Sequence, residues 1–99
     1  MERMYSGHWA EDELTQAQAA GVAYVVLAEP VPQGIALTVI QTADRLVTLT
    51  VTYATAGFDL TEATTELARF GFTVTSWTAR GTETGRHTAR AVHDRRREW

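Results

Sequence analysis

The chain has 99 residues, a hydrophobic content of 44% and a formal net charge of −3. A chain of this length folds around one hydrophobic core, so we expect a single domain over residues 1–99. It contains no cysteine, which excludes disulfide bonds, thiolate catalysis and cysteine-ligated zinc. No stretch resembles a signal peptide or approaches the roughly 18 apolar residues that a membrane span needs. We therefore expect a cytoplasmic protein that does not bind membranes.

The N-terminal third of the chain predicts one helix followed by one buried strand. We expect residues 1–9 to be flexible. Residues 10–20 are rich in helix-forming residues with acids in the first turn, which predicts a helix that ends before Gly21. Residues 22–28 are apolar on both faces and β-branched, which predicts a central strand covered on both sides. The two prolines within residues 29–33 then predict a break in the strand.

A β-hairpin is predicted between Gly34 and Ala54, where apolar residues alternate with threonines. This alternation has the two-residue period of a strand with one apolar face and one threonine face. A three-residue loop over residues 42–44 brings apolar residues opposite one another, whereas a two-residue loop mismatches every later pair. The pairs that the three-residue loop predicts are Ile35 with Val51, Leu37 with Leu49, Val39 with Val47, Thr38 with Thr48 and Ile40 with Leu46.

A second helix and a fourth strand are predicted after the hairpin. Asp59 and Glu62 have the spacing of a capping box, and Gly71 stands where a C-terminal cap belongs. These signals predict a helix over residues 60–70. Residues 72–78 alternate again, which predicts a strand.

The last segment is predicted to be a connector followed by a short helix. Residues 81–85, with the sequence GTETG, form the connector, and Ala89, Val92 and Trp99 have helical spacing. The element order is therefore α-β-β-β-α-β with a further C-terminal helix. This order predicts an α+β fold, in which helices pack on one face of a mostly antiparallel four-stranded sheet.

Catalytic and metal-binding motifs are not recognisable in the sequence. His87 and His93 are six residues apart, which on a helix places them about 240° apart around the axis, unlike a metal-binding pair. Neither Ser6 nor Ser76 stands in a nucleophile-elbow motif. Capping explains the acids at the helix starts. We therefore expect a non-enzymatic protein with no catalytic residue, no metal site and no cofactor.

The threonine face of the predicted sheet is the first candidate binding surface. It is poor in the charges that usually keep exposed sheets apart, and apolar residues flank it. Such a face suits a protein interface, either with a second copy in a homodimer or with a target protein. The candidate residues of this face are Thr38, Ile40, Leu46, Thr48, Thr50, Thr52 and Trp77.

The arginine-rich C-terminal segment, residues 80–99, is the second candidate binding surface. It contains six arginines and three acids, so it carries about +3 while the rest of the chain carries about −6. Such a segment suits an acidic protein surface or a nucleic acid. The candidate residues are Arg86, Arg90, Arg95, Arg96, Arg97 and Trp99.

These features predict a small protein-binding or accessory protein that acts through the sheet face or the C-terminal end. A phage or mobile-element inhibitor fits this size, and the use of arginine without lysine suggests a GC-rich genome such as that of an actinobacterium or its phages. A nucleic-acid-binding regulator that uses the C-terminal arginines is one alternative. Another is a small-molecule regulatory domain, because residues 66–81, ELARFGFTVTSWTARG, resemble the helix-to-strand passage of ACT-type ligand-binding domains.

Overall fold

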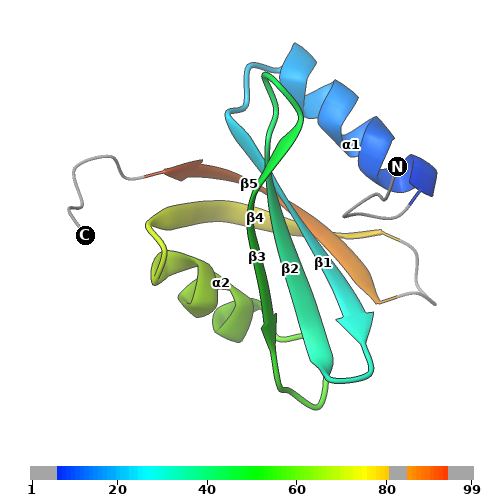
Figure 1. The fold of residues 1–99 in the computed structure, drawn as a ribbon, viewed down its shortest axis with the longest axis vertical. Coiled ribbons are helices and arrows are strands. Elements are labelled where there is room, and N and C mark those ends of the chain that lie inside the picture. Colours follow the sequence, from blue (N-terminus) through cyan, green and yellow to red (C-terminus); the bar gives the residue numbers. More distant parts are fainter. Residues whose placement is uncertain (1–6, 81–84, 94–99) are drawn as a thin grey trace.

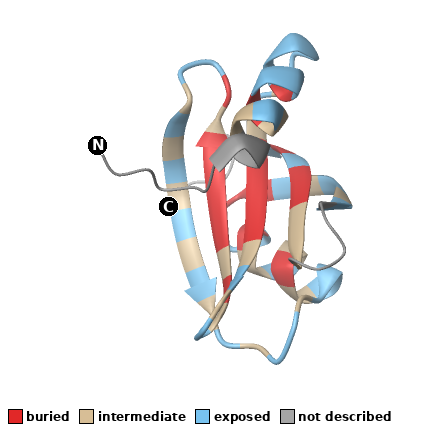
Figure 2. Ribbon diagram, turned by 90° about the vertical axis from the view of Figure 1, so that its right-hand side faces the viewer, coloured by how far each residue is buried: buried red, intermediate tan, exposed pale blue. Residues whose placement is uncertain are grey.

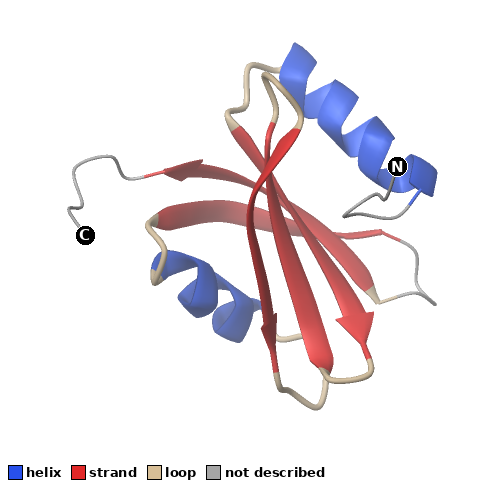
Figure 3. Ribbon diagram, viewed as in Figure 1, coloured by secondary structure: helices blue, strands red, loops and turns tan. Residues whose placement is uncertain are grey.

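The computed structural model describes residues 7–80 and 85–93. Its helices are α1 (Gly7–Ala19) and α2 (Leu60–Ala68), and its strands are β1 (Tyr24–Val31), β2 (Gly34–Gln41), β3 (Leu46–Tyr53), β4 (Phe72–Arg80) and β5 (Arg86–His93). The strands form one antiparallel sheet in the order β3-β2-β1-β5-β4 (Figure 1 and Figure 3). The α+β class predicted from the sequence is confirmed. Neither of the two described helices is long and apolar enough to cross a membrane.

The sheet has five strands, whereas the sequence predicted four, because the segment predicted as a C-terminal helix forms β5. β5 lies between β1 and β4. Its Ala89 and Ala91 are buried, and so is Thr88 on the opposite face. Alanine and arginine favour helices in isolation. The central strand β1 nevertheless needs hydrogen-bonding partners along both of its edges, and β5 supplies the second one.

The two helices pack on opposite faces of the sheet, which corrects the prediction that both lie on one face (Figure 1). Successive residues of β1 point to alternate faces. Val26 and Ala28 belong to the core that contains Leu67 of α2, whereas Val25 belongs to the core that contains Leu14 of α1. A strand that is apolar on both faces must be covered on both, so the prediction of a central, doubly covered strand is confirmed.

The core on the α2 face is the larger of the two. Its buried residues are Val26, Ala28, Ile35, Leu37, Val39, Ala63, Leu67, Phe72, Ala89 and Ala91. The core on the α1 face consists of Leu14, Ala17, Val25, Leu27 and Ile40, with Val22 and Val47 packed against it. Burial is thus concentrated in the middle strands and falls off toward β3 (Figure 2).

The register of the β2–β3 hairpin differs from the predicted register by two residues from Ile35 to Val39 and by one residue at Ile40. Leu37 pairs with Val51 instead of Leu49, and every predicted pair shifts in the same direction. The loop has four residues, Thr42–Arg45, because Gln41 already pairs with Leu46. A shift of two residues keeps the side chains of Leu49–Tyr53 on their predicted faces, so alternation alone does not distinguish the two registers there. The prediction that Val47 shares the apolar face of Leu49 is wrong, because the bulge places Val47 against the core on the α1 face. The remaining predicted pairs become Ile35 with Tyr53, Val39 with Leu49, Thr38 with Thr50 and Ile40 with Val47, with a bulge at Thr48.

Contacts to α1 hold the loop of this hairpin. Arg45 has a positive φ of 60°, and its guanidinium Nη1 lies 2.9 Å from the Glu11 carboxylate. The Thr42 hydroxyl donates to the carbonyl of Val22, and the Gln18 side-chain amide donates to the carbonyl of Thr42 at 3.1 Å. The longer loop is therefore fixed by contacts with a helix that is distant in sequence.

The first helix and the first strand extend beyond their predicted ends. α1 begins at Gly7, inside the segment predicted to be flexible, and ends at Ala19 as expected. β1 continues through Pro30 to Val31, where the sequence predicted a break. Pairing with β5 ends at Ala28, so within the described residues Pro30 has a neighbouring strand, β2, on one side only. Proline lacks a backbone N–H, and at this position no described strand on the other side needs that N–H as a hydrogen-bond donor.

The second helix agrees with its sequence signals. The Asp59 carboxylate accepts a hydrogen bond from the backbone N–H of Glu62 at 3.0 Å, as the capping box predicts. After the helix, Gly71 has a φ of +87°, which is the conformation that a glycine C-terminal cap provides. The predicted fourth strand is β4, interrupted by a bulge between Val74 and Trp77. The predicted connector falls mostly on residues 81–84, outside the described residues.

Candidate functional site

The sequence-predicted sheet face is not one continuous surface. Thr38 and Ile40 are only 7% and 0% exposed, and Ile40 belongs to the core that contains Leu14 of α1. Trp77 belongs to the opposite face: its ring contacts Phe58 at 5.2 Å and its Nε1 donates to the Thr64 hydroxyl of α2 at 3.0 Å. The other four predicted residues, Leu46, Thr48, Thr50 and Thr52, are exposed along β3. Leu46 pairs with Gln41, so the bulge places it on the face opposite Thr50 and Thr52.

β3 is an edge strand, and most of it lacks the features that usually protect an edge. Its eight residues, LVTLTVTY, include no charged residue and no proline. The bulge at Thr48 lies near its beginning and leaves Leu49–Tyr53 in regular pairing with β2. In the described part of the chain, no strand pairs with its outer side (Figure 2). Charges, prolines and bulges are the usual means by which proteins block such an edge.

The apolar row of β3 is only partly covered. Leu49, Val51 and Tyr53 pack against the core on the α2 face but stay half-buried, whereas Leu37 and Val39 of β2 are 0% exposed. Part of each apolar side chain in this row therefore faces solvent at the margin of the sheet. One more strand beside β3 would bury the row as β3 buries β2.

The Tyr53 hydroxyl is an unusual polar group at the end of this row. Its oxygen is buried and has no hydrogen-bond partner within the described residues. Burial, together with the nearby negative charges of Glu62, Glu66 and Asp59, raises the pKa of Tyr53 to about 12. The hydroxyl therefore stays protonated at neutral pH.

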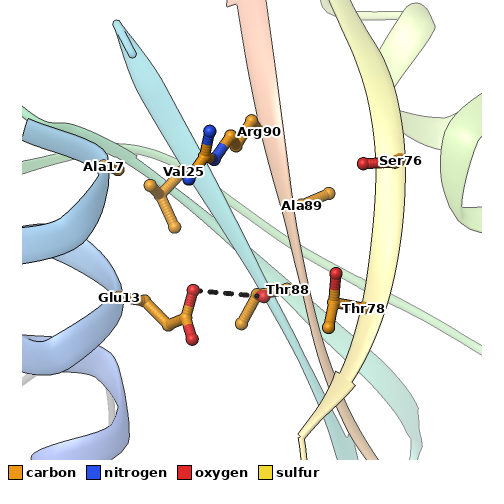
Figure 4. Close-up of a pocket in the computed structure, with 8 residues that line it drawn as sticks. All are labelled: Glu13, Ala17, Val25, Ser76, Thr78, Thr88, Ala89 and Arg90. Atoms are coloured by element: carbon orange, nitrogen blue, oxygen red, sulfur yellow. Dashed lines mark hydrogen bonds between the residues drawn. The ribbon is translucent and has the colours of Figure 1, made fainter. Parts of the chain in front are cut away.

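A polar cleft lies on the α1 face, between α1 and the pair β4 and β5 (Figure 4). Its volume is about 200 Å³. Its lining residues are Glu13, Ala17, Val25, Ser76, Thr78, Thr88, Ala89 and Arg90. The Thr88 hydroxyl donates to the Glu13 carboxylate at 3.4 Å. These two residues are 75 positions apart, so no local sequence signal could have predicted the cleft.

The predicted arginine surface is described only in part. Arg86 Nε lies 3.3 Å from the Glu29 carboxylate, and Arg90 contributes to the polar cleft. Both stand on β5, on the α1 face. Arg95, Arg96, Arg97 and Trp99 lie outside the described residues.

The histidines of β5 have structural contacts. His87 stacks on Phe58 with ring centroids 3.9 Å apart, and His93 meets the Phe72 ring at 4.8 Å. On a strand, six residues separate them by about 20 Å, so the helical geometry used for the sequence-based interpretation does not apply. Within the part of the chain that the structure describes, no group of three histidine, aspartate or glutamate side chains is placed to hold a metal ion.

No protein-family model matches the chain, and no curated protein and no solved structure matches it either. The interpretation of the site therefore depends on its own geometry. Within the described residues, that geometry offers an edge strand that is uncharged and regular over Leu49–Tyr53, and a polar cleft beside α1.

Proposed function

We propose that the chain is a non-enzymatic protein-binding domain that binds its partner by strand addition to the outer edge of β3. The observation that carries this proposal is the uncharged edge of β3 beside a half-buried apolar row. In strand addition, backbone hydrogen bonds give affinity, and side chains at alternate positions give specificity. Here the row of Leu49, Val51 and Tyr53 would supply the apolar contacts, and the exposed threonines would supply the polar side.

The test compares two variants that carry the same charge change. Thr50→Lys places a charge on the edge strand, and Thr65→Lys places one on the exposed surface of α2. Each protein is immobilised and used to capture proteins from cells of the source organism. We expect partners of the wild type to be retained by Thr65→Lys and lost by Thr50→Lys. Equal capture by both variants would reject the edge as the binding surface.

A second candidate function is favoured by the polar cleft, which combines a carboxylate, a guanidinium and three hydroxyl groups. Charges of both signs suit a small zwitterion such as a free amino acid, whose carboxylate would meet Arg90. The test is thermal unfolding in the presence of each of the common amino acids. Binding to the folded state raises the melting temperature. An increase that is lost in Arg90→Ala but kept in Arg69→Ala would support this function.

The remaining sequence-based alternatives stay predictions. Nucleic-acid binding by the C-terminal arginines depends on Arg95, Arg96 and Arg97, which lie outside the described residues. A cytoplasmic location and an origin in a phage or mobile element also stay predictions. Titration with random-sequence duplex at low and physiological salt tests the nucleic-acid alternative, because phosphate contacts make binding strongly salt-dependent.

A further inference from the structure

We infer that the strand added to β3 is the β3 strand of a second copy of this chain, so that two five-stranded sheets join into one continuous sheet. This inference rests on the proposed strand addition and names its partner. It follows from three properties of β3: its neutrality, the alternation of Leu49–Tyr53 and the position of its bulge.

Neutrality is the first property. A twofold interface brings each residue of a strand opposite a residue of the same strand in the second copy. A charged edge strand therefore meets its own charge and repels itself. Leu46–Tyr53 contains no charged residue, so β3 can meet a second β3 without juxtaposing like charges.

Alternation is the second property. In an antiparallel pair, residues directly opposite each other point to the same face of the sheet. The apolar row of β3 consists of the odd-numbered residues Leu49, Val51 and Tyr53. The apolar rows of the two copies therefore lie on the same face only when odd-numbered residues are opposite odd-numbered residues. In each such register within Leu49–Tyr53, every paired apolar residue gains an apolar neighbour, and the threonines meet one another on the other face.

The bulge selects one of these registers. It lies at Thr48, so the regular part of the strand is Leu49–Tyr53, and its middle residue is Val51. When the twofold axis passes between the two copies of Val51, Val51 meets Val51 of the second copy, and Leu49 meets Tyr53 of the second copy. On the other face, Thr50 meets Thr52. All five regular residues are then paired, and the bulge stays outside the interface.

The absence of cysteine from the chain allows this register to be tested directly. Opposite residues in an antiparallel pair have Cβ atoms about 4.5 to 5.5 Å apart, close to disulfide geometry, whereas diagonal neighbours are about 7 to 8 Å apart. Thr50→Cys and Thr52→Cys are prepared as separate proteins and mixed under mild oxidation. We expect disulfide-linked dimers that contain one of each variant. Either variant alone should give few, because its cysteines are diagonal neighbours.

The matched control uses two exposed threonines of α2. Thr61→Cys and Thr65→Cys, mixed in the same way, measure the background from random collisions. Sedimentation equilibrium at tens of micromolar gives an independent measurement, with twice the 11.0 kDa chain mass expected for the wild type and for Thr65→Lys. Thr50→Lys should give the mass of one chain with an unchanged circular dichroism spectrum.

A monomeric wild type that forms no cross-links above the α2 background would overturn the second copy as partner. The proposed function is tested separately, because capture of a different protein that depends on Thr50 would still support strand addition. The opposite result is also informative. If the β3 cysteines form cross-links but Thr50→Lys captures the same partners as the wild type, the homodimer is retained. The edge is then rejected as the binding surface for other proteins.

Discussion

The two edges of the sheet differ in how they are protected. At one edge, β4 is bent by a bulge, and Trp77 ties it to α2 through a hydrogen bond to Thr64. At the other edge, β3 is regular over Leu49–Tyr53, uncharged and only half-buried. The sheet therefore has one edge stabilised by a helix and one edge that is open to pairing. Four sets of substitutions test this contrast.

The largest expected difference is between truncations of the two edges. Trp77→Ala should lower the free energy of unfolding by about 3 kcal/mol, because it removes a large aromatic contact and a hydrogen bond. Leu49→Ala should cost about 1 to 2 kcal/mol, less than the usual penalty for a fully buried leucine. Chemical denaturation at low protein concentration measures both. Equal losses would show that the β3 edge is covered as well as the β4 edge.

Removing the α2 cap should weaken the protected edge by a smaller amount. Asp59→Ala leaves the Glu62 backbone N–H without its acceptor, which should cost about 1 kcal/mol. Asp59→Asn is the control, because it keeps a capping oxygen and should cost much less. Hydrogen exchange should show faster exchange in α2 and β4, with β3 unchanged. Loss of protection in β3 instead would indicate that both edges depend on α2.

Tyr53 gives a pH-dependent test of the open edge. Its pKa is raised to about 12 in the folded state, so the unfolded chain loses this proton first as the pH rises. The contribution of Tyr53 is therefore complete below about pH 10 and lost between about pH 10 and 12. Between about pH 10 and 12, the free energy of unfolding of the wild type should fall more steeply than that of Tyr53→Phe, as measured by chemical denaturation at each pH. Parallel plots of this free energy against pH would show that the hydroxyl is not desolvated.

The smallest expected effect concerns the exposed threonines. Thr50→Ala on β3 and Thr75→Ala on β4 should each change the stability of the monomer by less than about 0.5 kcal/mol. Thr75 donates to the Arg90 carbonyl at 3.3 Å, but it is exposed, so water can replace that hydrogen bond. A loss above about 1 kcal/mol for Thr50→Ala at low concentration would show that its face is covered within one chain.

Local signals were sufficient wherever one segment carried its own information. The capping box at Asp59 placed the start of α2, and the doubly apolar stretch 22–28 indicated a central strand. Alternation and the absence of charge identified the exposed threonines of β3 from the amino-acid sequence alone. The predicted face wrongly grouped these threonines with Thr38, Ile40 and Trp77. Thr38 and Ile40 are buried, and Trp77 packs on the α2 face. Periodicity does not reveal which helix lies over which face.

By itself, the sequence determined the α+β class, both helices and the two faces of Leu49–Tyr53, because helix caps and the two-residue period are local properties. Only the tertiary structure decided that residues 86–93 form a strand, that the hairpin pairs out of its predicted register, and that helices cover both faces. Those choices depend on contacts between distant residues, such as Arg45 with Glu11 and β5 with β1. The packing and hydrogen bonding of those contacts outweigh the small differences in local propensity.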